Sequence, residues 1–207
     1  MKARKRTRIE DIRREELIRA AHRVFLAQGL AGLTTASICA EAGMSPGILA
    51  YYFRGKEDVL FQMVRYNNRI LMEDIVHRMR AAATPWDRLV AIIEGNFPAA
   101  NYDRAAANAW LSVCAAASTN PEYARLQRTF YRRLASNLAS CLRPVLTGDR
   151  LDALILTIGV MIDGLWLRRA SDDSMTRERA VTRLHDQIVA SLTPAELQSL
   201  RQTPAPH

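Results

Sequence analysis

The chain has 207 residues, of which 49% are hydrophobic, and this is the composition of a globular protein rather than of a disordered one. Its formal net charge is +8, with 26 Arg against 3 Lys, which favours a polyanionic partner. No apolar run approaches the ~18 residues of a membrane span, and no apolar stretch follows the charged start, so we expect a cytoplasmic protein without a signal peptide or a membrane partner.

Cysteine and histidine placement argues against a disulfide framework and against an active site. Cys39, Cys114 and Cys141 are far apart and odd in number, so we expect free thiols that pack as small apolar residues. The four histidines are scattered, and no HExxH, GxSxG, Walker A or CxxC pattern occurs. The sequence therefore predicts no enzymatic activity, no metal site and no cofactor.

Signals for the start of a helix recur along the chain, whereas no segment shows the alternation of apolar and polar residues that is typical of a strand. A capping residue followed by proline occurs at Ser45-Pro46, Thr84-Pro85, Asn120-Pro121 and Thr193-Pro194. The last three pairs are followed by an acidic residue, which complements the positive end of a helix dipole: Asp87, Glu122 and Glu196.

The apolar spacing predicts an all-α chain of nine to ten helices. We place them at residues 10–28, 35–42, 46–52 and 56–80, from Thr84 to the break at 95–98, at 103–117 and 121–146, from 149 onward, and at 176–192 and 194–201. Near residue 56 the composition shifts to longer helices rich in Ala and Leu. We therefore predict an N-terminal domain at 1–56, which opens with a basic arm at 1–9, and a second domain at 57–207.

Residues 34–53 have the pattern of a helix-turn-helix. Gly43 can adopt the left-handed conformation that ends a helix sharply. Ser45 is expected to cap the next helix, and Pro46 and Gly47 keep its first turn small, so that it can approach base edges or phosphates. A glycine turn also fits a helical hairpin that binds no ligand, and the turn alone leaves both interpretations open.

The residues around the turn favour DNA. Hydroxyl, phenol and ammonium groups are typical phosphate contacts, and a flexible basic arm can enter the minor groove or remain a solvated tail. Residues 1–60 carry a net charge of +4. The predicted DNA-binding residues are Lys2, Arg4, Arg6, Thr34, Thr35, Ser45, Pro46, Gly47, Tyr51, Tyr52 and Lys56. They predict a nucleoid-associated protein that binds double-stranded DNA.

The same stretch resembles the TetR family of transcription regulators. The residues that carry the resemblance are Leu33-Thr34-Thr35, Ile38, Ala42-Gly43-Met44-Ser45, Gly47-Ile48-Leu49, Tyr52-Phe53 and Lys56. The resemblance implies an N-terminal helix-turn-helix and a C-terminal domain that binds a ligand and dimerises. Ala50 departs from the family, which usually has a phosphate-contacting Tyr there, so this contact is lost or passes to Tyr51. The helix at 46–52 also lacks Arg, Asn or Gln for a bidentate base contact.

The C-terminal part resembles the BetI branch of the family, the choline-responsive repressors of glycine betaine synthesis genes. The blocks that carry this resemblance include Gly95-Asn96-Phe97, Ala109-Trp110-Leu111, Arg132-Arg133-Leu134 and 162–168. The resemblance implies a repressor released by choline or a related quaternary ammonium. Several blocks are shared with other repressors, so an unrelated apolar or aromatic effector stays open.

Aromatic faces and a nearby carboxylate are the groups that hold a quaternary ammonium. The candidate effector residues in the second domain are Phe97, Tyr102, Trp110, Tyr131, Asp163 and Trp166. Trp110, Trp166 and Asp163 form the candidate cage. The alternative is that these rings serve only as core and that Asp163 pairs with Arg168 or Arg169.

Broad apolar stripes on the helices that begin at 149 and 176 favour a homodimer. A twofold dimer places two recognition helices about one DNA turn or a multiple of it apart, which predicts a palindromic operator. Effector binding would then shift the helix at 56–80 and separate the two recognition helices. The alternatives are that both stripes are buried within one chain, and that the chain is a helical scaffold that binds only protein.

Overall fold

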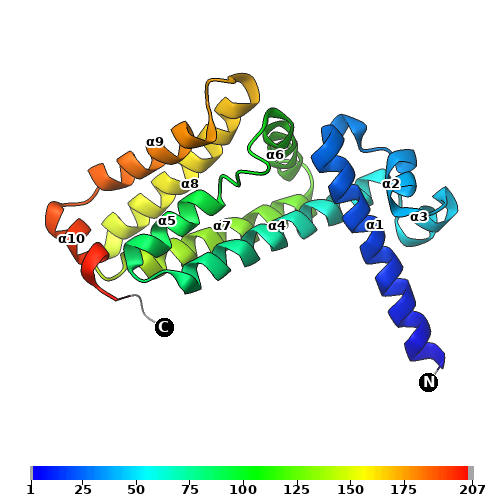
Figure 1. Ribbon diagram of the computed structural model, residues 1–207, viewed down its shortest axis with the longest axis horizontal. Helices are drawn as coiled ribbons and strands as arrows, with labels where there is room; N and C mark the ends of the chain where they lie inside the picture. The colour runs from blue at the N-terminus through cyan, green and yellow to red at the C-terminus, as the bar shows by residue number, and fades with distance from the viewer. Residues whose placement is uncertain (1, 205–207) are drawn as a thin grey trace. The chain divides into compact units, whose positions relative to one another are not determined.

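The computed structural model describes residues 2–204, and the side chains of residues 1–9 and of Leu30 lie outside its described part. Residues 2–204 form ten helices and no strand, which confirms the all-α prediction (Figure 1). No helix among these residues is both long enough and apolar enough to cross a membrane. The helices are α1 (Lys2–Gly32), α2 (Thr35–Ala42), α3 (Pro46–Tyr52), α4 (Lys56–Ala81), α5 (Pro85–Gly95), α6 (Arg104–Ala117), α7 (Pro121–Leu142), α8 (Gly148–Ser171), α9 (Arg177–Ala190) and α10 (Pro194–Gln202).

The chain divides into two compact units between Ile70 and Leu71. This boundary lies within α4, whereas the sequence places it at residue 56. The difference arises because the first half of α4 packs within the first unit, where Val59 is fully buried and Asn67 Oδ1 lies 3.0 Å from His22 Nε2 of α1. The second unit contains the rest of α4 and helices α5 to α10.

Side-chain caps start three of the four helices that the capping-proline pairs predict. The hydroxyls of Thr84 and Thr193 and the side chain of Asn120 each accept a hydrogen bond from a backbone N–H in the first turn. The expected cap at Ser45 is wrong, because its side chain makes no such bond. The Ser45 carbonyl instead accepts from the N–H of Ile48 at 3.0 Å, which leaves the exposed hydroxyl outside the helix start.

The N-terminal segment is helical rather than an arm that precedes the first helix. α1 begins at Lys2, so its backbone covers most of the residues predicted as a flexible arm. Gly29, with φ 68° and ψ −171°, breaks the regular helix where the sequence predicts its end. The side chains of Lys2, Arg4 and Arg6 lie outside the described residues, so their expected DNA contacts stay predictions.

The core of the first unit forms where α1 packs against α2 and where α2 meets α3. Leu17, Ala20 and Ala21 of α1 are fully buried. Leu33 and Leu49 complete this core from the loop before α2 and from α3. Burial of one face of α3 holds the helix in place, and its opposite face remains exposed.

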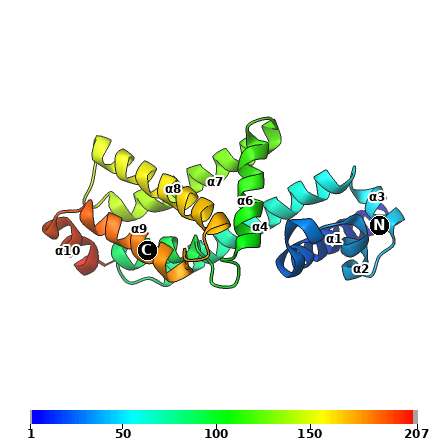
Figure 2. The same cartoon turned by 90° about the horizontal axis from the view of Figure 1, so that it is seen from above.

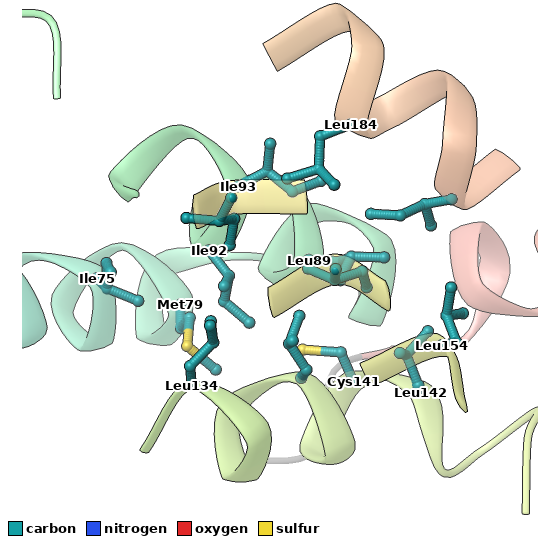
Figure 3. Close-up of a cluster of buried hydrophobic side chains, with 14 of the residues drawn as sticks. Ile75, Met79, Leu89, Ile92, Ile93, Leu134, Cys141, Leu142, Leu154 and Leu184 are labelled. Atoms are coloured by element: carbon teal, nitrogen blue, oxygen red, sulfur yellow. The ribbon is translucent and has the colours of Figure 1, made fainter. Parts of the chain in front are cut away.

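The core of the second unit brings together side chains of α4, α5, α7, α8, α9 and α10, and Figure 3 shows part of it. α4 supplies Ile75 and Met79, and α5 supplies Leu89, Ile92 and Ile93 from a strongly amphipathic helix. The remaining labelled side chains come from α7, α8 and α9: Leu134, Cys141, Leu142, Leu154 and Leu184. α8 contacts α6, α7 and α9, and Figure 2 shows it running alongside α9.

A close approach between α5 and α4 gives a test of this packing. A Cβ on Gly95 would lie 2.4 Å from Cγ1 of the fully buried Ile75. We expect Gly95→Ala to lower the free energy of unfolding in denaturant by ~1–3 kcal/mol through overpacking. Ile75→Ala removes the clashing atom, so the double variant should lose less than the sum of the two single losses. Strictly additive losses would contradict this account of Gly95.

Candidate DNA-binding surface and effector site

The turn between α2 and α3 has the geometry that the sequence predicts. The Thr34 hydroxyl accepts from the N–H of Ser37 at 3.0 Å and starts α2. Gly43 ends α2 in the left-handed conformation, with φ 63° and ψ 34°, which side chains with a Cβ adopt rarely. The N–H of Met44 then donates to the Cys39 carbonyl at 2.9 Å and fixes the path into α3. Two short helices therefore meet at a sharply defined turn.

α3 has one buried side and one exposed side. Leu49 is buried, whereas Pro46, Gly47, Ile48, Ala50 and Tyr51 are exposed. The exposed fraction of Tyr51 is 66%, and its phenol donates to Glu10 Oε1 of α1 at 3.3 Å. The exposed side of α3 is therefore apolar except for one phenol, which is already hydrogen bonded.

The other predicted DNA-binding residues of the first unit are less uniform in their surroundings. Thr34 is exposed, yet its hydroxyl is engaged with Ser37. Thr35 and Tyr52 are half-buried, and the Tyr52 ring packs edge-on against Tyr51 at 4.9 Å. Lys56 is exposed at the first position of α4. These residues all belong to one compact unit, and their roles at DNA stay predictions.

Ile48 is not among the DNA-binding residues that the sequence predicts, and the structure exposes it. Its exposed fraction is 37%, and it shares a helix face with Tyr51, which follows three residues later. The signal was present in the sequence, because Leu49 fits the buried stripe and its neighbour must then point elsewhere.

In the second unit, three of the predicted effector residues form one aromatic group. The ring centroids of Tyr102 and Trp166 lie 4.8 Å apart, and those of Phe97 and Tyr102 lie 5.6 Å apart. The Trp166 indole N–H donates to the Asn96 carbonyl at 3.1 Å, and Arg177 donates to the Phe97 carbonyl at 2.6 Å. These bonds hold the loop after α5 against α8 and α9.

The other three predicted residues meet around Asp163. Tyr131 donates its phenol to Asp163 Oδ2 at 2.6 Å, which joins α7 to α8. Phe130 connects Trp110 to this pair, with ring centroids 5.5 Å from Trp110 and 5.7 Å from Tyr131. Phe130 is buried and belongs to the core of the second unit, so a core residue contacts two of the predicted effector residues.

Two buried polar atoms in this region have no hydrogen-bond partner among the described residues: Asp163 Oδ1 and Tyr102 Oη. Such atoms are rare in folded proteins because each one forgoes its hydration. The alternative pairing of Asp163 with Arg169 is not seen, since Arg169 bonds to Asp173 at 2.8 Å. An unpaired carboxylate oxygen therefore lies among aromatic rings on the α8 side of the unit.

Burial governs the protonation of this cluster. It raises the pKa of the Asp163 carboxyl above its ordinary value, while the phenol of Tyr131 and the indole of Trp110 lower it in part. Burial and the adjacent carboxylate raise the pKa of Tyr131, so its phenol remains a hydrogen-bond donor. Burial likewise raises the pKa of Cys114 to about 11, which keeps this cysteine a thiol.

Fold and site together define a two-unit helical regulator, with a helix-turn-helix in one unit and a partly buried polar and aromatic site in the other. Residues 17–63 match the bacterial regulatory proteins of the tetR family, and residues 85–193 match the C-terminal domain of BetI-type transcriptional repressors. The chain therefore belongs to the TetR family and carries a BetI-type C-terminal domain.

Similar proteins agree with this placement. The HTH-type transcriptional regulator BetI of Brucella canis is 35% identical over 89% of this chain and 94% of its own length. The BetI regulator of Stenotrophomonas maltophilia is 39% identical over 77% of this chain and 82% of its own. A transcriptional regulator from Saccharomonospora viridis, solved in complex with choline, shares the fold with a TM-score of 0.71 at 22% identity, over 85% of this chain and 95% of that one.

These relatives are transcription regulators and not enzymes, in line with the absence of catalytic motifs from the sequence. Regulators of the TetR family bind DNA operators and small-molecule effectors, and they act as dimers. The helix-turn-helix and the predicted family are thus confirmed.

The raised pKa of Asp163 predicts how stability depends on pH. The folded protein holds the Asp163 proton more tightly than the unfolded chain does. The free energy of unfolding therefore falls as the pH rises from the ordinary carboxyl pKa through the raised one, and this loss persists above it. Asp163→Asn keeps an acceptor for Tyr131 without the charge, so we expect the ligand-free variant to have the higher Tm at neutral pH.

Thermal unfolding across acidic and neutral pH measures this difference. The Tm values of Asp163→Asn and the wild type should converge at low pH, where both side chains are neutral. Asp152→Asn, at an exposed position of the same helix, is the matched control and should follow the wild type. A Tm for Asp163→Asn below that of the wild type at neutral pH would contradict the prediction.

Proposed function

We propose that this protein is a repressor that binds a palindromic operator as a homodimer and is released by choline or a related quaternary ammonium cation. The observation that supports the effector class is the half-buried Asp163 carboxylate, whose Oδ1 is buried and unpaired among the described residues, in a unit of the BetI type. In the cell the protein acts at the nucleoid, in the cytoplasm.

The chemistry of the site supports a cation without N–H groups. A quaternary ammonium is stabilised by aromatic faces, at about 0.5–2 kcal/mol for each ring, and by a nearby negative charge. Tyr131 and Trp110 supply rings beside Asp163, and Trp166 follows Asp163 by one turn of α8 within the second aromatic group. The hydroxyl of choline also offers a donor for Asp163 Oδ1. The BetI relatives and the choline complex of the Saccharomonospora viridis regulator support the same ligand class.

The ligand-free arrangement supports a conformational response. With their centroids 4.8 Å apart, Tyr102 and Trp166 contact each other, and a trimethylammonium group cannot enter between their faces unless the rings separate. A ligand that needs separated rings favours the state that has them and shifts the population toward it. The effector is thus expected to move the loop that carries Tyr102.

A continuous series of contacts leads from this loop to α4. Trp166 is hydrogen bonded to the carbonyl of Asn96, and the preceding Gly95 lies directly against Ile75 of α4. The same helix begins at Lys56, next to the helix-turn-helix. In our proposal, displacement of Asn96 and Gly95 alters α4 and thereby the spacing of the two recognition helices in the dimer.

The dimer is proposed to form through α8 and α9. Leu156, Val160 and Leu167 of α8 are 68%, 61% and 54% exposed, and their spacing of four and seven residues places them on one face. Leu184 and Ile188 of α9 are buried within the same chain, so α8 supplies most of the apolar side chains of the proposed interface.

Choline and its neutral carbon analogue, 3,3-dimethylbutan-1-ol, test the effector class. We expect millimolar choline to bind in isothermal titration and to release the protein from DNA upstream of its own gene in a gel shift. The analogue has the same shape and hydroxyl but no charge, so it should do neither. Equal effects of both compounds would indicate an apolar effector, and no response to choline from a folded dimer would contradict the proposal.

Leu156→Glu tests the dimer surface. A carboxylate in the centre of an apolar interface has no partner there and is costly to bury. We expect this variant to sediment as a monomer and to lose operator affinity at the same protein concentration. Thr129→Glu, at an exposed position of α7, is the control and should remain dimeric. A dimeric Leu156→Glu protein would place the interface elsewhere.

A further inference from the structure

The exposed side of α3 carries an aliphatic side chain in the position of a base reader. Ile48 follows Gly47 and precedes Tyr51 by three residues, so these three share the exposed face. Its exposed fraction of 37% contrasts with 3% for Leu49, the next residue. α3 therefore presents Ile48 to the solvent and Leu49 to the core.

Hydrogen-bonding side chains are scarce on the same helix. Pro46–Tyr52 contains no amide, guanidinium, ammonium or carboxylate, and its hydroxyls belong to Tyr51 and Tyr52 alone. The Tyr51 phenol donates to Glu10, and Tyr52 is half-buried. The donor and acceptor pattern of the base edges consequently has few matching groups on the side chains of α3.

We propose that Ile48 makes α3 select thymine, through apolar contact with the 5-methyl group in the major groove. This methyl group is the one apolar feature that a base pair presents there, and an aliphatic side chain has no other base-edge group to recognise. Ala50, small and exposed, places no bulky side chain next to it on α3. The inference rests on the proposed function, in which α3 enters the major groove of the operator.

Replacement of thymine by uracil isolates the methyl group. Uracil keeps the hydrogen-bonding pattern of thymine and lacks only the methyl. The probes are the shortest footprinted operator duplex from upstream of the protein's own gene and the same duplex with deoxyuridine at each thymidine position. Binding of the full-length protein to both is measured by fluorescence anisotropy at one fixed salt concentration, with an unrelated duplex for non-specific binding.

For the wild type we expect the uracil probe to bind about fourfold more weakly for each methyl group contacted, since burial of a methyl-sized group has about this effect. Ile48→Ala should bind the thymine probe more weakly and bind both probes alike. Ile70→Ala is the matched control, because its exposed fraction is 39% and it lies on α4, outside the reading helix. This control should keep the preference of the wild type for thymine.

Three outcomes overturn parts of this account separately. Equal wild-type binding to both operator probes, each tighter than to the unrelated duplex, overturns the inference and leaves the regulator function intact. A thymine preference that Ile48→Ala retains overturns the role of Ile48. No preference for the operator over the unrelated duplex overturns the proposed function together with this inference. Thermal unfolding shows that the variants are folded in each case.

Discussion

The hydrogen bond from Tyr131 to Asp163 is the interaction on which the second unit depends. It joins α7 to α8 at 2.6 Å and keeps a carboxylate inside a largely apolar unit, where burial disfavours its charge. One phenol satisfies one oxygen, and the other oxygen has no partner among the described residues. A fully satisfied carboxylate would stabilise the ligand-free state, whereas the unpaired oxygen leaves a place for an external group. The site therefore contains a carboxylate oxygen that needs a hydrogen-bond or charge partner, and the described residues do not supply one.

α8 contributes to the effector site, to the core and to the proposed dimer surface, and its length makes this possible. Over 24 residues one face buries Leu154 and Ile158 in the core, while Leu156 and Val160 remain exposed on another. Asp163 lies near the C-terminal end, one turn before Trp166. Because residues three, four and seven apart share a helix face, the core residues occupy one face of α8, and Asp163 lies along the same face as Leu156 and Val160. Displacement of this helix would affect all three, which links effector binding to the dimer.

Local rules predicted most of the fold. Thr84 and Thr193 fixed helix starts because a cap involves only neighbouring residues, and Gly43 ended α2 because few residues adopt a left-handed backbone. The misses depend on contacts that local rules do not contain. The first half of α4 packs on α1 within the first unit. At the start of α3, the N–H of Ile48 donates to the carbonyl of Ser45 and not to its hydroxyl. The effector residues could be named by type, but their division into two groups, bridged through Phe130 on one side, required the packing of α7 against α6 and α8.

Magnitudes indicate why the carboxylate matters to the proposed switch. Reversal of a two-state population from 1:99 to 99:1 requires about 5.5 kcal/mol of preference for one state. Three aromatic contacts at about 2 kcal/mol each reach that value only at their upper limit, and the contact between Tyr102 and Trp166 must be broken to form them. Rings alone therefore bind a cation without switching the protein. The additional free energy has to come from a group that is poorly satisfied before the ligand arrives, and the buried Oδ1 of Asp163 is in that position.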